Sequence, residues 1–217
     1  MKRSLNHICA LFFAGLVFAC LCAAGCTAKD AQPQENNPSP EHQPTPVSKT
    51  KTQDIVTAAG GAFSVTSSGI SGGTISDEYG KRGSQKAGLV PTLSLPLSIN
   101  NPPEGTACFA LTMIDPDSEP LCGYAWVHWL ACGFTETNLP ANASIDAANA
   151  MIQGKNGFGQ TGYGGPVPPD KPHTYVITVY ALDASPALAE GFSQDDLLFE
   201  IKGHVLAAAQ ISATYAN

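Results

Sequence analysis

Three runs of aromatic and β-branched residues place the strongest constraint on how this chain can fold. They span residues 107–114, 125–132 and 174–182, and each is bounded by Pro, Gly or Asp turn residues. Such side chains fit the pleated, half-buried surface of a sheet, so we predict that the three runs are central strands. Shorter strands are predicted at 62–67 and 92–99. The sequence therefore indicates a mainly β domain.

Helix is predicted only near the C-terminal end. Ser193 and Asp196 form a capping-box pattern before the apolar run 197–201. Gly203 is expected to end this helix, and residues 204–214, which include three successive alanines, are predicted to form a second helix. The fold class that follows is a β-rich domain closed by C-terminal helices.

The N-terminal segment has the composition of a bacterial lipoprotein signal. Basic residues precede an apolar run at 8–24, small residues end it, and Cys26 comes next. This arrangement resembles a lipobox, so residues 1–25 are predicted to be a signal peptide and Cys26 the site of a palmitate-bearing lipid anchor. An uncleaved anchor and ordinary secretion are the alternatives, and either would also export the domain. We expect an extracytoplasmic protein that is lipid-anchored at the cell membrane.

Residues 26–53 are rich in Pro, Gln, Asn, Glu, Thr and Lys. Such a segment cannot bury enough apolar surface to offset its loss of conformational entropy, so we predict a tether between Cys26 and a single domain at 54–217. Removal of Lys2 and Arg3 with the signal peptide changes the formal net charge from −7 to −9. An acidic chain argues against nucleic acid and against electrostatic docking on an anionic membrane, which leaves the lipid as the attachment.

Three cysteines, Cys108, Cys122 and Cys132, lie in the predicted domain. They form no C-x-x-C unit, which argues against a zinc cluster. If the first two central strands pair in the register that sets Cys108 opposite Cys132, an exported protein would be able to form a disulfide there. This pairing is a hypothesis that depends on the register alone.

Polar residues gather at the ends of the three predicted central strands. Asp115 and Asp117 follow the first, His128 lies in the second, and His173 and Tyr175 open the third after a loop rich in Gly and Pro. If the strands are neighbours, these groups and the loop amides would face one pocket that suits an oxyanion. Asp115 is expected to orient His128 and favour its protonated form. Taken singly, each residue also has a structural interpretation, as a turn aspartate or a hydrogen-bonded core histidine.

The order of these motifs is similar to that of the phosphatidylethanolamine-binding protein family, in its bacterial Raf-kinase-inhibitor-like branch. The motifs are D-P-D at 115–117, H-W at 128–129, G-Y-G-G-P-V-P-P at 162–169 and H-T-Y at 173–175. The resemblance implies a large antiparallel sheet packed on a smaller sheet, C-terminal helices, and a small anion-binding pocket. Thr174 stands where the family usually has arginine, which removes an oxyanion donor. Carried over by position, the ligand-binding residues would be Asp115, Asp117, His128, Gly165, Pro168, His173 and Tyr175.

We expect a non-catalytic binding or inhibitor module, because the sequence offers no nucleophile paired with a base. The expected partner is a phosphate-bearing small molecule or a phospholipid head group, with an envelope protein as a further partner; no cofactor is predicted. Two alternatives remain open. A metal-dependent or acid/base hydrolase would use Asp115, His128 and His173. A loop-mediated inhibitor of an extracytoplasmic hydrolase would leave the pocket in a secondary role.

Overall fold

The computed structural model describes residues 62–217. The predicted signal peptide, Cys26 and the tether lie outside the described residues, as do residues 54–61. Within the described range, no helix has the length and apolarity needed to cross a bilayer.

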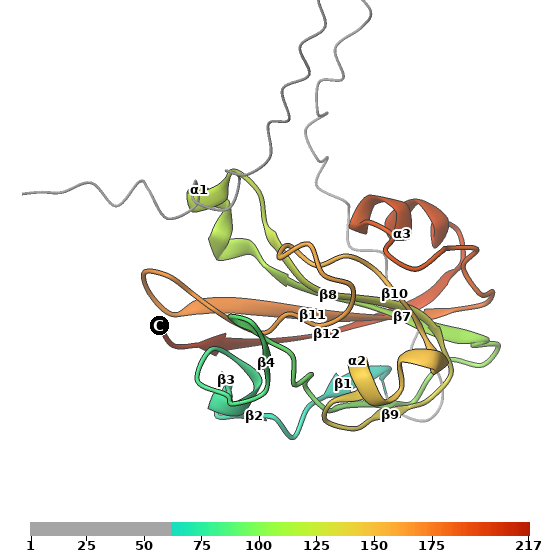
Figure 1. The fold of residues 1–217 in the computed structure, drawn as a ribbon. Helices are drawn as coiled ribbons and strands as arrows, with labels where there is room; N and C mark the ends of the chain where they lie inside the picture. Colours follow the sequence, from blue (N-terminus) through green and yellow to red (C-terminus); the bar gives the residue numbers. More distant parts are fainter. Residues whose placement is uncertain (1–61) are drawn as a thin grey trace, which may run out of the picture. The chain divides into compact units, whose positions relative to one another are not determined.

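One large curled sheet forms the centre of the domain, with strands in the order β10-β8-β7-β11-β12-β3-β2 (Figure 1). The three predicted central strands are confirmed as the neighbours β8, β7 and β11. Each pairing in this sheet is antiparallel except that of β12 with β3, which makes the sheet mixed. In chain order the strands are β2 (Ile70–Ser71), β3 (Thr74–Ile75), β7 (Cys108–Asp115), β8 (Trp126–Phe134), β10 (Ile152–Gln153), β11 (His173–Leu182) and β12 (Val205–Tyr215).

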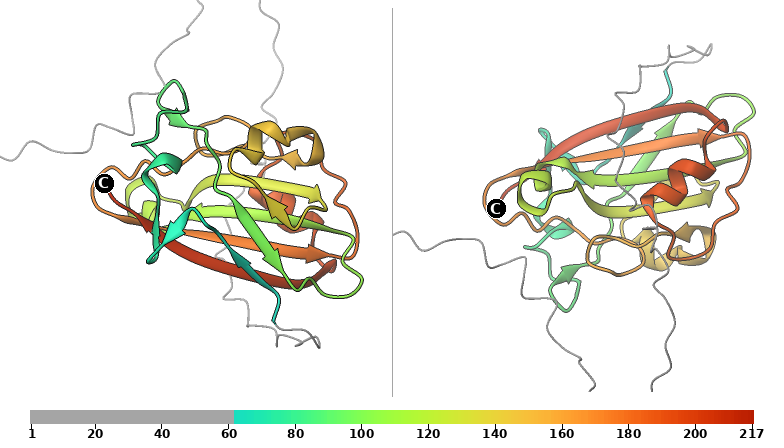
Figure 2. Two further views of the ribbon diagram at one scale, coloured as in Figure 1. Left: turned by 90° about the horizontal axis from the view of Figure 1, so that it is seen from below. Right: turned by 90° about the horizontal axis from the view of Figure 1, so that it is seen from above.

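A smaller sheet and a helix cover opposite faces of the large sheet. Figure 1 shows α3 (Gln194–Glu200) above the large sheet and the small sheet below it, and the two views of Figure 2 show the same layers from either side. The small sheet has the order β1-β6-β9, formed by Ser64–Thr66, Leu97–Asn100 and Asn138–Leu139. A hairpin of β4 (Lys86–Ala87) and β5 (Val90–Pro91) forms a third, two-stranded sheet. The remaining elements are short helical turns: η1 (Asp77–Tyr79), η2 (Pro116–Ser118), α1 (Glu119–Cys122), α2 (Ala143–Asp146) and η3 (Ala148–Ala150).

Alternate residues of the central strands supply two separate apolar cores, because successive side chains of a strand point to opposite faces. Phe109, Leu111 and Met113 join the core that contains residues of the small sheet. Cys108 and Ala110 of the same strand join the core under α3. The large sheet is therefore buried on both faces, which explains why β7 is apolar along almost its whole length.

The helix predicted at 193–201 is confirmed as α3. Ser193 accepts a hydrogen bond from the Asp196 amide, and the Asp196 carboxylate accepts one from the Ser193 amide, which completes the capping box. The second predicted helix is wrong, because residues 205–215 form β12. Its alanines favour helix, but alternate positions of the segment are buried against the domain and it pairs with β11 from Leu182 to His173. Tertiary pairing thus outweighs local helix propensity.

The register predicted to join Cys108 and Cys132 is also wrong. Cys132 lies opposite Ala110, in the regular ladder that pairs Met113 with Trp129 and Leu111 with Ala131, so Cys108 is two residues out of register with it. Gly133, with a φ of 77°, is an extra residue beyond this pair. Cys108 and Cys132 are both buried and carry free thiols. Burial raises the pKa of Cys132 to about 12, so this thiol stays protonated and unreactive near neutral pH.

Candidate functional site

The candidate site lies where β8, β7 and β11 meet, at the end of the sheet that carries Asp115 and His173. Asp115 ends β7 opposite Trp126, which begins β8. His128 is an extra residue in β8, since Met113 pairs with Trp129 and Ile114 pairs with Val127. A bulge of this kind turns its side chain out of the regular alternation, and bulges recur beside functional sites for this reason.

His128 is held by a reciprocal pair of hydrogen bonds with Gly164. Its carbonyl oxygen accepts from the Gly164 amide at 2.8 Å, and its Nδ1 lies 2.5 Å from the Gly164 carbonyl oxygen. Because a carbonyl oxygen only accepts, Nδ1 carries the proton of the neutral ring and Nε2 carries the lone pair. Burial lowers the pKa of His128 to about 4, despite opposing contributions from Gly164 and Asp115. Asp115 therefore favours the protonated form of His128 as predicted, but burial outweighs it, and the His128 ring is oriented by Gly164 instead.

Asp115 instead binds His173, which lies between two carboxylates. Nδ1 of His173 donates to Asp115 Oδ2 at 2.7 Å, and Nε2 donates to Asp170 Oδ1 at 2.9 Å. The same Asp115 oxygen accepts from the Ser118 hydroxyl at 2.7 Å. Burial alone would lower the pKa of His173, but the two carboxylates outweigh it and the pKa is raised. His173 is thus a buried imidazolium whose donors are both used within the protein.

Asp117 has a structural contact of its own. Its Oδ2 accepts from the Thr174 amide at 2.8 Å, which ties η2 to the start of β11. This backbone hydrogen bond is the main cause that lowers the pKa of Asp117. Thr174, where the resemblance leads one to expect arginine, is thus held through its backbone by Asp117.

The loop at 156–169 shapes the site, and the amides of its two central glycines are bonded within the protein. The amides of Gly164 and Gly165 donate to the carbonyls of His128 and Pro91, both at 2.8 Å. A Cβ on Gly165 would overlap the carbonyl oxygen of Tyr79, so glycine is needed here for close packing. The Pro168 carbonyl accepts from Lys81 Nζ at 3.2 Å. Gly165 and Pro168 thus contribute backbone shape, and the predicted amide donors are already used.

A row of aromatic rings runs from the surface to the buried end of the site. Tyr124 stacks on Trp126, Trp126 meets Phe158 edge to face, Phe158 contacts His128, and His128 contacts Tyr175 at 5.0 Å between ring centroids. The sequence interpretation missed Trp126 and Phe158 as site residues. Trp126 lies two positions before His128, and residues at this spacing in a strand point to the same face. This spacing was the sequence signal that Trp126 belongs to the site. Asp170, three positions before His173, was also missed.

Three buried polar atoms in residues 62–217 lack a protein hydrogen-bond partner, and all three lie at this site. They are Asp115 Oδ1, Trp126 Nε1 and Tyr175 Oη. Buried polar groups are rarely left unpaired, since each costs about 1–3 kcal/mol, and such exceptions recur at binding sites. Burial raises the pKa of Tyr175, so its hydroxyl remains protonated. One acceptor, one donor and one hydroxyl are therefore left unpaired among the residues of this site.

Among the described residues, no group of three or more His, Cys, Asp or Glu side chains is placed to hold a metal ion. Asp115, His128 and His173 lie together, but the ring nitrogens of His173 are both committed to carboxylates. The geometry thus gives no support to the metal-dependent hydrolase alternative.

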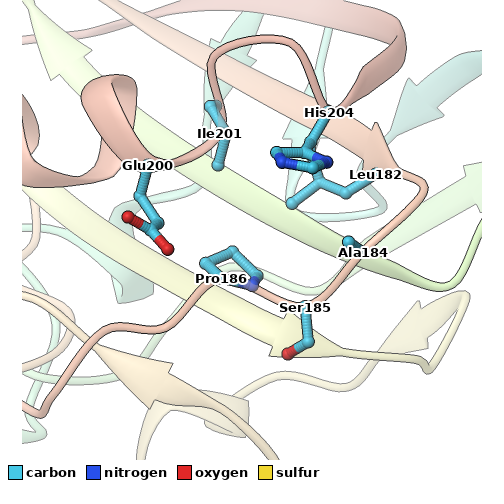
Figure 3. Close-up of a pocket in the computed structure, with 7 residues that line it drawn as sticks. All are labelled: Leu182, Ala184, Ser185, Pro186, Glu200, Ile201 and His204. Carbon is cyan, nitrogen blue, oxygen red and sulfur yellow. The ribbon is translucent and has the colours of Figure 1, made fainter.

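A separate small pocket lies at the opposite end of β11 (Figure 3). Leu182, the last residue of β11, lines it together with Glu200 and His204, whereas His173 is the first residue of the strand. His204 Nδ1 is 2.8 Å from Asp183 Oδ1, so its ring is held at the surface. This pocket shares no residue with the candidate site.

Comparison with known proteins agrees with this fold. The family model described as phosphatidylethanolamine-binding protein matches residues 65–216. The uncharacterized protein YxkA of Bacillus subtilis is 39% identical over 150 residues, which cover 62% of this chain and 89% of that protein. The UPF0098 protein YbcL of Escherichia coli is 33% identical over 170 residues, which cover 73% of this chain and 90% of that protein.

Two solved structures superpose on the domain. A phosphatidylethanolamine-binding protein homologue from Chlamydia trachomatis has a TM-score of 0.63 at 31% identity, over 72% of this chain and 98% of that one. The E. coli YbcL structure has a TM-score of 0.62 at 31% identity, over 71% and 98% of the two chains. The family model covers residues 65–216, and both solved structures share the fold of this domain. The chain therefore belongs to the phosphatidylethanolamine-binding protein family.

Proposed function

We propose that this domain is a non-catalytic binding module whose site at the ends of β8, β7 and β11 takes a small oxyanion, such as the phosphate of a phosphorylated small molecule or head group. The observation that carries this proposal is that Asp115 Oδ1, Trp126 Nε1 and Tyr175 Oη, in residues of the same strand ends, are buried without protein partners. A phosphate group both donates and accepts hydrogen bonds when it carries a proton, so it can satisfy all three atoms. Membership of the phosphatidylethanolamine-binding protein family fits a role as a non-catalytic binding module.

Titration with phosphoethanolamine is expected to shift the NMR signals of the Trp126 indole N–H and the His128 ring. Both groups lie at the site, and the Trp126 donor is unpaired in the protein. His173 should respond less, because both of its nitrogens are bonded to carboxylates. His204, at the opposite end of β11, serves as the internal reference. The absence of any shift in Trp126 and His128 at millimolar ligand would contradict the proposal.

We further propose that the chain is attached to a membrane through a lipid on Cys26. The support is the sequence pattern of a basic start, an apolar run and small residues before Cys26. The full chain expressed in a bacterium with labelled palmitate is expected to incorporate the label and to partition with membranes. Cys26→Ala should abolish the label, whereas Cys22→Ala, a cysteine in the same apolar run, should retain it. Label on the Cys26→Ala chain would rule out this attachment site.

A further inference from the structure

β12 lies along the rim of the large sheet, where Figure 2 shows it in dark red. On one side it pairs with β11 from Leu182 to His173. On the other, outer side it pairs with β3 through the single pair Thr214 and Thr74. Within residues 62–217, the segment 205–213 therefore has no strand paired to its outer side.

The backbone of this edge has hydrogen-bonding groups that point away from the sheet. The Thr214 amide donates to the Gly73 carbonyl at 2.8 Å, so the backbone of Thr214 faces away from β11. Residues of an antiparallel strand alternate between facing the paired strand and facing away from it, and β12 keeps one register with β11 from Ala208 to Thr214. Ala208, Gln210 and Ser212 therefore face outward as Thr214 does. In the described part of the chain, no backbone carbonyl accepts from these three amides.

The edge lacks the features that usually keep a further strand from pairing with it, which are charged side chains, proline, bulges or a covering segment. The sequence of β12, V-L-A-A-A-Q-I-S-A-T-Y, contains no charged residue and no proline. Its register shift lies at its start, next to Val205, and so outside the outward-facing residues. β1 lies near β12 but packs on its buried face, where Val65 and Ala209 belong to one core. The outward-facing residues are exposed, so a further strand can reach them.

We propose that this edge is a dimer interface, at which β12 of a second copy of the chain pairs antiparallel with β12 and continues the large sheet. The inference does not depend on the proposed anion-binding function. A two-fold axis makes the two strands antiparallel and sets each residue opposite a fixed mate. With the axis at Gln210, this residue lies opposite itself and Ala208 lies opposite the partner subunit's Ser212. All three outward-facing residues of each copy are then paired.

The charge and size of the side chains on β12 suit a second copy of the same strand. The chain has a formal net charge of −7, so charged residues on this edge would face like charges across the two-fold axis. β12 carries none. The Gln210 side chain has both a donor and an acceptor, so two of them can bond to each other at the axis. Ala208 and Ser212 are small, so the two backbones can approach to the usual strand spacing of about 4.8 Å.

An antiparallel pair of β12 strands would place the two candidate sites at opposite ends of the joined sheet. Each site lies at the His173 end of β11, and His173 pairs with Tyr215 at the end of β12. Because the second β12 runs in the opposite direction, its Tyr215 lies at the far end of the interface. The dimer therefore leaves both sites uncovered by the partner strand.

Cross-linking of the full chain in the membranes of an expressing bacterium tests the position of the axis. Gln210→Cys is expected to give a covalent dimer with a short bismaleimide, because residues opposite each other in a hydrogen-bonded antiparallel pair have Cα atoms about 5.5 Å apart. Asn138→Cys, at an exposed position of the edge strand β9, is the matched control and should give no more dimer than the wild-type chain. The wild-type chain measures the background from its own cysteines.

Sedimentation equilibrium of the full chain in density-matched detergent should give the mass of a dimer. Ser212→Pro removes one outward amide from each copy, so we expect it to raise the dissociation constant about 10- to 100-fold. The fold should tolerate this proline, because the lost amide is not one that bonds to β11. Gln210→Lys sets two ammonium groups against each other at the axis and should weaken the dimer as well. Asn138→Lys adds the same charge on β9 and should leave the dimer intact.

A wild-type chain that sediments as a monomer at every concentration would overturn the proposal. So would a dimer that both Ser212→Pro and Gln210→Lys leave unchanged, or equal cross-linking at positions 210 and 138. If the proline variant fails to fold, Gln210→Lys decides the question, because its side chain is exposed and its backbone is unchanged. A dimer that is weakened by both edge variants and cross-linked at position 210 supports the proposal.

Discussion

Asp115→Ala is expected to lower the free energy of unfolding by about 3–5 kcal/mol, which is the typical cost of removing one partner from a buried ion pair. Asp115 is 3% exposed, and its Oδ2 holds both the His173 imidazolium and the Ser118 hydroxyl. Without it, His173 keeps only Asp170, and Ser118 loses its acceptor. Chemical denaturation of the wild-type and variant domains measures the difference.

The pH dependence of this difference has a fixed sign. The folded pKa of His173 is raised above its usual value of 6.5, so the pair stabilises the domain fully below pH 6.5 and loses this contribution as the pH rises through the folded pKa. The gap between wild type and Asp115→Ala should thus be largest near pH 6 and shrink at alkaline pH. Asp170→Ala, which removes the exposed carboxylate on the other nitrogen, should cost much less than Asp115→Ala, because solvent screens an exposed pair. Equal costs for the two variants would contradict the buried-pair interpretation.

His128 is expected to make the domain less stable in acid by about 3 kcal/mol between pH 7.5 and pH 4. Burial lowers its pKa from 6.5 to about 4, and each pKa unit corresponds to about 1.4 kcal/mol. The unfolded chain binds more protons than the folded one between these two values, so stability rises with pH across this window. Direct NMR titration of the His128 ring should give a midpoint near pH 4.

His128→Asn isolates this contribution, because His173 acts in the opposite direction in wild type. An asparagine amide reaches the Gly164 carbonyl much as Nδ1 does, but it does not titrate. The stability difference between wild type and His128→Asn should therefore fall by about 3 kcal/mol from pH 7.5 to pH 4. A difference that stays constant over this range would show that His128 is not held neutral by burial.

The strands of the domain were predictable where local chemistry and tertiary structure agree. The runs that became β7, β8 and β11 combine β-branched and aromatic residues with clear turn residues at both ends. The segment that became β12 misled prediction, because its alanines favour helix locally while its alternate burial is set by pairing with β11. Alternation of Ala209, Ala213 and Tyr215 on the buried face was the available signal.

The site was predictable as a set of residues but not as a set of contacts. Strand order brings Asp115, His128, His173 and Tyr175 together, as the family motifs imply. The hydrogen-bond partner of each residue depends on the bulge at His128. The His128 ring bonds to Gly164, and Asp115 bonds to His173 instead of His128. A one-residue bulge depends on how two strands pair, so the local sequence of either strand does not predict it.

The sequence by itself determined the strand-forming runs, the helix cap at Ser193, and which polar residues end the central strands, because these follow from side-chain chemistry at short range. Only the tertiary structure decided which histidine carries the charge, which loop amides are already bonded, and which atoms remain unpaired. These properties depend on burial and on partners far apart in the chain. The predicted amide donors of Gly164 and Gly165 are thus bonded within the protein, while atoms of Asp115, Trp126 and Tyr175 are left unpaired, and both results are products of packing.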